Sequence, residues 1–259
     1  MFDLDYLVET LTPKRTDETD SMETIRLFGE KYNRVFDFGL GISVPDNPMG
    51  HPRFGLLETV EYARLSVFPE KIVMNLNTFH TKKELDRLLK AAVEKGIRYL
   101  LVIRGDGGPQ LSKLDPKSIG GDKNVATSSD LIRYINFEYA DKFITGAAFN
   151  QYNRMPFESD RLKQKIEAGA KFVITQPVIG KDPRVNSIFD FGLPVVIEAW
   201  MSKNVDLLYK SVRKQKDAGD AGYDPVTNLQ LLHEAYPENC VYLSMLSFKQ
   251  DWKSILPKL

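Results

Sequence analysis

Short apolar runs alternate with helical stretches along the chain, and eight of the runs have the length of a β-strand. Strands that alternate with helices are typical of a parallel sheet covered on both faces. The predicted strands span residues 6–11, 35–44, 71–78, 99–103, 143–149, 172–178, 195–200 and 241–246. The predicted helices span residues 17–32, 55–66, 81–96, 127–139, 159–168, 184–191, 205–216, 225–235 and 251–256.

The helix predicted between the third and fourth strands has the clearest signals. Thr81 and Glu84 have the spacing of a capping box at its start. Leu85 and Leu89 belong to an apolar stripe at helical spacing, and Gly96 ends the pattern.

Eight strand–helix units favour closure of the sheet into a (β/α)8 TIM barrel over an open doubly wound sheet, and 259 residues suit one such barrel. No GxGxxG follows the first strand, which weakens the open dinucleotide-binding alternative. Neither a linker nor a composition break divides the chain, so we expect one domain over residues 1–259. Residues 45–52 and 105–123, rich in Gly and Pro, are predicted loops, and long loops in compact domains are usually functional.

Nearly every predicted strand ends at or near a polar residue. In a closed parallel barrel these ends converge on one rim, where barrel enzymes hold their active sites. The predicted rim residues are Glu9, Asp46, Asn77, Asp106, Asn150, Gln176, Glu198 and Ser247.

Composition narrows the expected partners. Lys and Arg number 35, and so do Asp and Glu, so no net charge would attract nucleic acid or an anionic membrane. The chain lacks a transmembrane-length apolar stretch and a signal-peptide pattern, so a cytoplasmic enzyme is the default expectation. Cys240, the only cysteine, reads as a packed thiol that cannot form an internal disulfide. His51, His80 and His233 lack metal-ligand spacing, so we expect no metal site.

Two carboxylates lie inside otherwise apolar strands. Glu9 is costly to bury as a charge, so burial would raise its pKa towards that of a useful acid, unless it forms a salt bridge with Lys14. Three roles are open for Glu198: an acid–base pair with Glu9, a contact to a ring nitrogen of a substrate, or an ion pair with a lysine.

Three segments together resemble the methylenetetrahydrofolate reductase family. Residues 8–14 (VETLTPK) are similar to its first-strand pattern FEFFPPK, and residues 96–106 to the fourth-strand segment that ends in LRGD. Residues 162–176 are similar to LKxKxxAGAxxxITQ, and residues 129–131 to the start of the fourth helix. The resemblance runs in register from about residue 9 to residue 176, and the rest matches in strand–helix order alone.

The resemblance implies a flavoprotein of one-carbon metabolism. NAD(P)H would reduce FAD and leave, and the flavin would then reduce 5,10-methylenetetrahydrofolate, or a related tetrahydropterin, to the 5-methyl form. Glu9 would be the general acid that opens the folate's five-membered ring. Lys165 would contact the phosphate side of the flavin, and Gln176 the substrate or the nicotinamide.

These considerations define a predicted site. Glu9 and Asp106 are the predicted catalytic residues. The predicted cofactor-binding residues are Asn77, Arg104, Gly105, Asp106, Ser129, Phe149 and Lys165. The predicted substrate-binding residues are Glu9, Asp46, Gln176 and Glu198. Tyr152, like Phe149, is a candidate to stack on a flavin or pterin ring.

Departures from the family pattern leave alternatives open. The family's third-strand histidine falls at Met74 or Asn75, its second-strand threonine becomes Pro45, and its eighth-strand arginine is replaced near Phe248. Residues 148–154 lack the family's histidine after strand five. The rivals are a flavin-free folate reductase, a methyltetrahydrofolate-dependent methyltransferase, and a non-catalytic partner subunit. The choice between NADH and NADPH, the identity of the pterin and the oligomeric state are left open.

Overall fold

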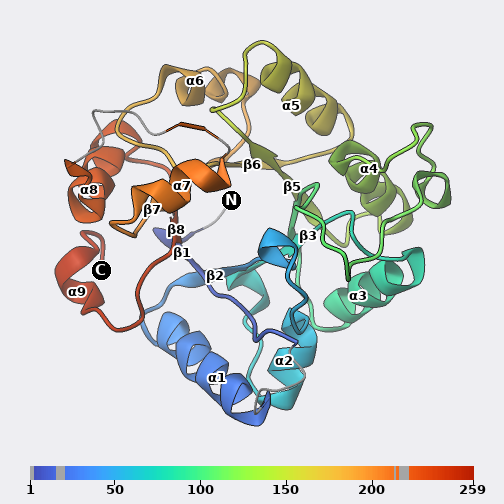
Figure 1. Cartoon of the computed structure of the whole chain (residues 1–259), viewed down its shortest axis with the longest axis horizontal. Coiled ribbons are helices and arrows are strands. Elements are labelled where there is room, and N and C mark those ends of the chain that lie inside the picture. The colour runs from blue at the N-terminus through green and yellow to red at the C-terminus, as the bar shows by residue number, and fades with distance from the viewer. Residues whose placement is uncertain (1–2, 16–20, 213, 216–221) are drawn as a thin grey trace.

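The computed structural model describes residues 3–15, 21–212, 214–215 and 222–259. Eight parallel strands close into a barrel in chain order, β1 to β8, and helices surround it (Figure 1). The predicted TIM-barrel fold is therefore confirmed. The strands are β1 (Tyr6–Glu9), β2 (Gly41–Val44), β3 (Ile72–Leu76), β4 (Tyr99–Val102), β5 (Ile144–Phe149), β6 (Phe172–Thr175), β7 (Val195–Trp200) and β8 (Val241–Ser244).

Helices lie between consecutive strands, as a parallel barrel requires. The α-helices are α1 (Ser21–Asp37), α2 (Leu56–Tyr62), α3 (Lys82–Glu94), α4 (Ser128–Glu138), α5 (Phe157–Glu167), α6 (Pro183–Asn186), α7 (Val205–Ser211), α8 (Pro225–Ala235) and α9 (Trp252–Ile255). Short 3₁₀ helices are η1 (Pro48–Gly50), η2 (Pro69–Lys71), η3 (Pro116–Ile119) and η4 (Phe189–Phe191). No described helix has both the length and the apolar character needed to cross a membrane.

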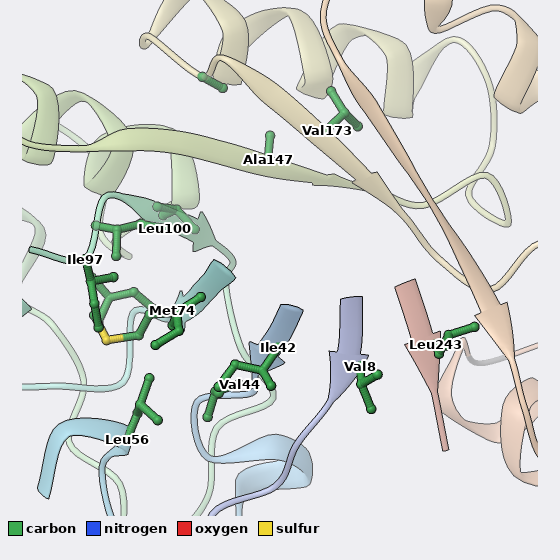
Figure 2. Close-up of a cluster of buried hydrophobic side chains, with 14 of the residues drawn as sticks. Val8, Ile42, Val44, Leu56, Met74, Ile97, Leu100, Ala147, Val173 and Leu243 are labelled. Atoms are coloured by element: carbon green, nitrogen blue, oxygen red, sulfur yellow. The ribbon is translucent and has the colours of Figure 1, made fainter. Parts of the chain in front are cut away.

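The apolar core has two layers because alternate residues of each strand face opposite sides of the barrel wall. The outer layer lies between strands and helices, and Figure 2 shows part of it, from Val8 on β1 to Leu243 on β8. The inner layer fills the barrel itself. Its buried members are Leu7, Val73, Leu101, Phe172, Ile174, Val196 and Tyr242.

The predicted strand over residues 35–44 is wrong in its first half. Residues 35–37 end α1, Gly39 turns the chain with a φ of 75°, and β2 begins at Gly41. The physical reason is helical spacing: Val35 is buried with Phe28 and Tyr32, on one face of α1. The first four residues of the predicted 17–32 helix lie outside the described residues, and so do residues 213 and 216 of the predicted 205–216 helix.

The capping box predicted for α3 is confirmed. Thr81 Oγ1 accepts from the Glu84 backbone N at 3.2 Å, and Glu84 Oε2 accepts from the Thr81 N at 2.8 Å. Gly96 follows the helix with a φ of 74°, the left-handed conformation that glycine adopts without strain.

Candidate active site

Two carboxyl groups and a phenol face the interior of the barrel near its mouth. On β8, Tyr242 is paired with Leu7 of β1 and with Glu198 of β7. Because strand side chains alternate, Glu9 shares the inner face with Leu7 and therefore with Tyr242. The Tyr242 hydroxyl donates to Glu9 Oε1 at 3.2 Å, and the Met245 backbone N donates to Oε2 at 3.1 Å. Both donors come from β8 or its following loop, so they bind the Glu9 carboxyl to that strand.

The environment favours protonation of both carboxyls. Burial raises the pKa of Glu9, although the hydrogen bonds from Met245 and Tyr242 and the charge of Arg53 oppose the shift. Burial also raises the pKa of Glu198 well above its ordinary value; a hydrogen bond from Ser244 opposes this, and the charge of Glu9 adds to it. Both side chains are only partly buried by surface area, so a bound molecule could reach them. The described residues contain no ion pair between Glu9 and Lys14, the alternative role considered for Glu9.

Arg53, in the loop after β2, is a site residue that the sequence reasoning missed. Its charge acts on Glu9, while its Nη1 donates to the Thr12 carbonyl and its backbone N to Asn47 Oδ1 at 2.7 Å. Its Nε is buried and has no hydrogen-bond partner among the described residues. The sequence did contain a signal for this loop, because residues 45–52 are rich in Gly and Pro. That signal ends one residue before Arg53 and says nothing of its side chain. The sequence reasoning also missed Tyr242, because a single aromatic residue in an apolar strand is usually a packing residue.

Asp46 and Asn77 connect the loops after β2 and β3 through hydrogen bonds. Asp46 Oδ2 accepts from the Asn77 N at 2.9 Å and lies 2.7 Å from His80 Nε2. The Asn77 amide donates to the Asp46 carbonyl at 2.7 Å and accepts from the Phe79 N at 2.7 Å. Burial alone would lower the pKa of His80, but its hydrogen bond to Asp46 and the Asp46 charge outweigh burial and raise it. These side chains are therefore engaged with one another rather than turned to a ligand.

The loop after β4 carries three predicted residues. Gly105 has a φ of 81°, and a Cβ there would lie 2.9 Å from the Asn77 side chain, so the close approach requires glycine. Arg104 is exposed, and its carbonyl accepts from Thr78 Oγ1 at 2.9 Å. Asp106 is exposed, and its Oδ2 accepts from the Met49 N at 2.9 Å. This contact joins the loops after β2 and β4 above β3.

The other predicted cofactor residues lie apart. Phe149 is fully buried in the layer between barrel and helices. Lys165, on α5, is buried; its Nζ donates to the Ala148 carbonyl at 2.6 Å and lies 3.9 Å from Glu158 Oε1. Burial lowers the pKa of Lys165 to about 8, with Glu158 opposing the shift. Ser129 lies in the first turn of α4.

Three of the residues predicted to hold FAD, Asn77, Phe149 and Lys165, are therefore poorly placed to contact that cofactor. The Asn77 amide and the Lys165 ammonium are engaged with backbone groups, and the Phe149 ring is on the helix side of the wall. The loops after β2 and β4 are in backbone contact, since a Cβ on Gly50 would meet the Gly107 carbonyl at 1.7 Å.

Gln176 lies beyond β6 and is partly exposed, and its side-chain amide has no hydrogen-bond partner among the described residues. Gln151, which the sequence reasoning missed, is fully buried and donates to the Gln176 and Pro177 carbonyls at 2.8 and 3.0 Å. Tyr152 donates its hydroxyl to the Pro177 carbonyl at 2.7 Å. These bonds fix the chain at Gln176 and leave its amide free for a ligand.

The remaining two predicted rim residues serve local turns. Asn150 Oδ1 accepts from the Tyr152 N at 3.0 Å, and its own N donates to Glu158 Oε1 at 3.2 Å. The Ser247 carbonyl accepts from Trp252 Nε1 at 3.1 Å. The structure therefore brings together Glu9 and Glu198, and separately Asp46, Asn77 and the β4 loop.

Comparison with known proteins gives consistent matches in the middle of the chain. A family model described as methylenetetrahydrofolate reductase matches residues 70–183. Methylenetetrahydrofolate reductase 1 of Schizosaccharomyces pombe is 34% identical over 97 residues, which are 36% of this chain and 15% of that protein. Methylenetetrahydrofolate reductase 2 of the same yeast is 36% identical over 106 residues, 37% of this chain and 16% of that protein. Methylenetetrahydrofolate reductase 2 of Saccharomyces cerevisiae is 31% identical over 109 residues, which are 39% of this chain and 18% of that protein.

The matched part of the chain thus spans less than a fifth of each relative's length. Among solved structures, oxaloacetate acetylhydrolase superposes with a TM-score of 0.50 at 8% identity, covering 94% of this chain and 75% of that one. A likeness at that identity shows the barrel fold alone. The matches in sequence confirm the predicted resemblance to the methylenetetrahydrofolate reductase family for the central part of the chain, residues 70–183.

Proposed function

We propose that this chain reduces the bridging methylene group of 5,10-methylenetetrahydrofolate, or of a related tetrahydropterin, to the 5-methyl form with NAD(P)H. The family relationship over residues 70–183 supports the substrate class. The observation that carries the proposal is the Glu9 carboxyl, with a raised pKa, inside the mouth of a closed barrel.

The proposed reaction requires a proton donor and a nearby negative charge, and the carboxyl groups at the barrel mouth can supply both. Opening the five-membered ring breaks the bond between the methylene carbon and N10, and the departing nitrogen needs a proton. The cation left on the other nitrogen needs a nearby negative charge. Two carboxyls with raised pKa values, Glu9 and Glu198, can divide these two tasks. The free amide of Gln176 is suited to hydrogen-bond the pterin or the nicotinamide carboxamide.

The source of the hydride follows from the poor fit to FAD. Since Asn77 and Lys165 are engaged with backbone groups and Phe149 lies on the helix side of the wall, we propose the flavin-free form of the reaction, in which reduced nicotinamide gives its hydride directly to the methylene carbon. The purified protein should then be colourless, fail to retain added FAD, and oxidise NAD(P)H with the folate substrate in the absence of flavin. A protein that binds FAD and loses turnover when the flavin is removed would contradict this form.

The test of the reaction itself is Glu9→Gln, assayed by NAD(P)H oxidation and by the formation of methyltetrahydrofolate. We expect a loss in kcat of about 100-fold, the size of a typical acid–base contribution. The matched control is Glu138→Gln on the exposed side of α4, which should keep full activity. A Glu9→Gln variant as active as the control would refute the proposal. Methyl transfer with no nicotinamide requirement would instead favour the methyltransferase, and no turnover with a stable co-purifying protein would favour a partner subunit.

A further inference from the structure

We propose that β8 holds the Glu9 carboxyl in the orientation that proton transfer requires, through the Tyr242 hydroxyl and the Met245 backbone N–H. We call these two groups the β8 donor pair. The inference rests on the proposed function and assigns two positioning residues to it. Neither residue has to touch the substrate, because each acts through Glu9.

The first argument is that the donor pair leaves the carboxyl little freedom. The Tyr242 hydroxyl lies 3.2 Å from Glu9 Oε1 and the Met245 N lies 3.1 Å from Oε2, so each oxygen has its own fixed donor. A turn of the carboxyl about its bond to the side chain would break both contacts. A protonated carboxyl that accepts these two bonds still has its own O–H to donate. The donor pair therefore fixes the plane of the group and leaves its proton available to a bound molecule.

The second argument is the surroundings of the Tyr242 hydroxyl. Tyr242 is buried in the inner layer of the barrel, whose other buried members carry only apolar side chains. A phenylalanine would supply the same ring, so packing does not account for the hydroxyl. A buried hydroxyl is costly unless it forms a hydrogen bond, and here it donates to Glu9.

The third argument is the backbone at Met245. The Val241 N donates to the Asp5 carbonyl at 2.9 Å, and a parallel ladder repeats such bonds every two residues. Two repeats would bring the Met245 N to the Glu9 backbone carbonyl. Met245 instead has a left-handed φ of 58°, and its N donates to the Glu9 side chain. Such strain in a residue other than glycine is typical of functional sites. The turn thus directs this donor to the carboxyl.

Tyr242→Phe tests the hydroxyl, because it removes that group and keeps the ring. We expect kcat to fall about 10-fold with KM little changed, since Tyr242 acts through Glu9 and not on the substrate. Loss of a donor to the carboxylate should also raise the Glu9 pKa, so the fall in rate with rising pH should move to higher pH. Among the described residues Met245, Arg53 and Glu198 also act on Glu9, and the substitution leaves all three in place.

The matched control is Tyr6→Phe, which removes a buried tyrosine hydroxyl at the other end of the neighbouring strand β1. That hydroxyl lies 2.7 Å from His233 Nε2 and accepts from the Lys258 N at 3.3 Å, so it has no contact with Glu9. The control should keep both kcat and the pH profile of the wild type. A Tyr242→Phe variant that matched the control in both measurements would refute the positioning role.

Met245→Gly and Met245→Val test the backbone donor. Glycine adopts a φ of 58° without strain, so Met245→Gly should keep the kcat and the pH profile of the wild type. Valine resists this conformation, so Met245→Val should lose the donor, lower kcat and move the pH profile as Tyr242→Phe does. Equal kinetics in the two variants would contradict the role given to the turn at Met245.

A measurement without turnover separates this inference from the proposed reaction. Carbon-13 NMR of protein labelled at the glutamate side-chain carboxyl identifies Glu9 as the signal that Glu9→Gln lacks, and follows its titration. The Glu9 pKa should be higher in Tyr242→Phe than in the wild type or Tyr6→Phe. An inactive protein that shows this rise would refute the proposed reaction alone. An active reductase in which Tyr242→Phe changes neither this pKa nor kcat would refute the donor pair alone.

Discussion

Lys165 belongs to a sequence motif associated with cofactor binding, but in this structure its ammonium group has a structural role. The sequence pattern associates this lysine with a cofactor phosphate, yet its Nζ lies 2.6 Å from the Ala148 carbonyl and is covered by α5 and the end of β5. Burial lowers its pKa to about 8 despite the partner Glu158. The lysine thereby ties α5 to β5.

The depressed pKa of Lys165 predicts a dependence of stability on pH. Between pH 8 and 10.5 the unfolded chain holds a proton on this lysine that the folded protein has lost, so the free energy of unfolding should rise with pH through this window. The full rise is about 3 kcal/mol, at 1.36 kcal/mol per pKa unit. Urea unfolding at several pH values measures it as the difference between wild type and Lys165→Met, which cancels other titrating groups. A difference that is flat or falls with pH would show that Lys165 titrates normally.

At the scale of single elements, local signals decide where a helix begins but not always where it ends. The capping box of α3 is both predicted and observed. The end of α1 is not predicted, because Val35 and Phe36 read equally well as strand residues. Their burial on the helix face beside Tyr32 settles the matter, and that burial depends on the barrel wall.

The α3 cap gives a prediction at this scale. Thr81→Ala removes the acceptor for the Glu84 N and should lower the free energy of unfolding by about 1 kcal/mol. The control is Lys83→Ala, exposed in the same helical turn, which should change it by less than about 0.5 kcal/mol. Equal effects of the two substitutions in urea unfolding would mean that the cap contributes nothing to stability.

At the scale of the whole molecule, packing inside the barrel pairs a large side chain on one strand with a glycine on the neighbouring strand. Phe172 of β6 lies over Gly146 of β5, where an added Cβ would come 2.2 Å from the ring. Close-packed interiors cannot absorb such an overlap without moving neighbours.

Gly146→Ala should therefore lower the free energy of unfolding by about 1–3 kcal/mol, the usual cost of overpacking a core. Phe172→Leu in the same chain should recover part of that loss, because the smaller side chain vacates the space. The control is Gly222→Ala, because the added Cβ would meet none of the described residues within 4 Å. Strictly additive effects of the Gly146 and Phe172 substitutions would show that the two positions are not in contact.

The sequence by itself determined the barrel, since strand length, helical period and caps are local properties that repeat along the chain. It also marked Glu9 and Glu198, because a carboxylate in an apolar strand is costly enough to be conspicuous. Only the tertiary structure decided which polar residues share a site. Closure of the barrel placed Tyr242 opposite Glu198 and in hydrogen-bond contact with Glu9, and loop packing brought the charge of Arg53 near enough to oppose the rise in the Glu9 pKa. The same packing engaged Asn77 and Lys165 with backbone groups. Contacts between segments distant in the chain depend on register and loop path, which no local pattern encodes.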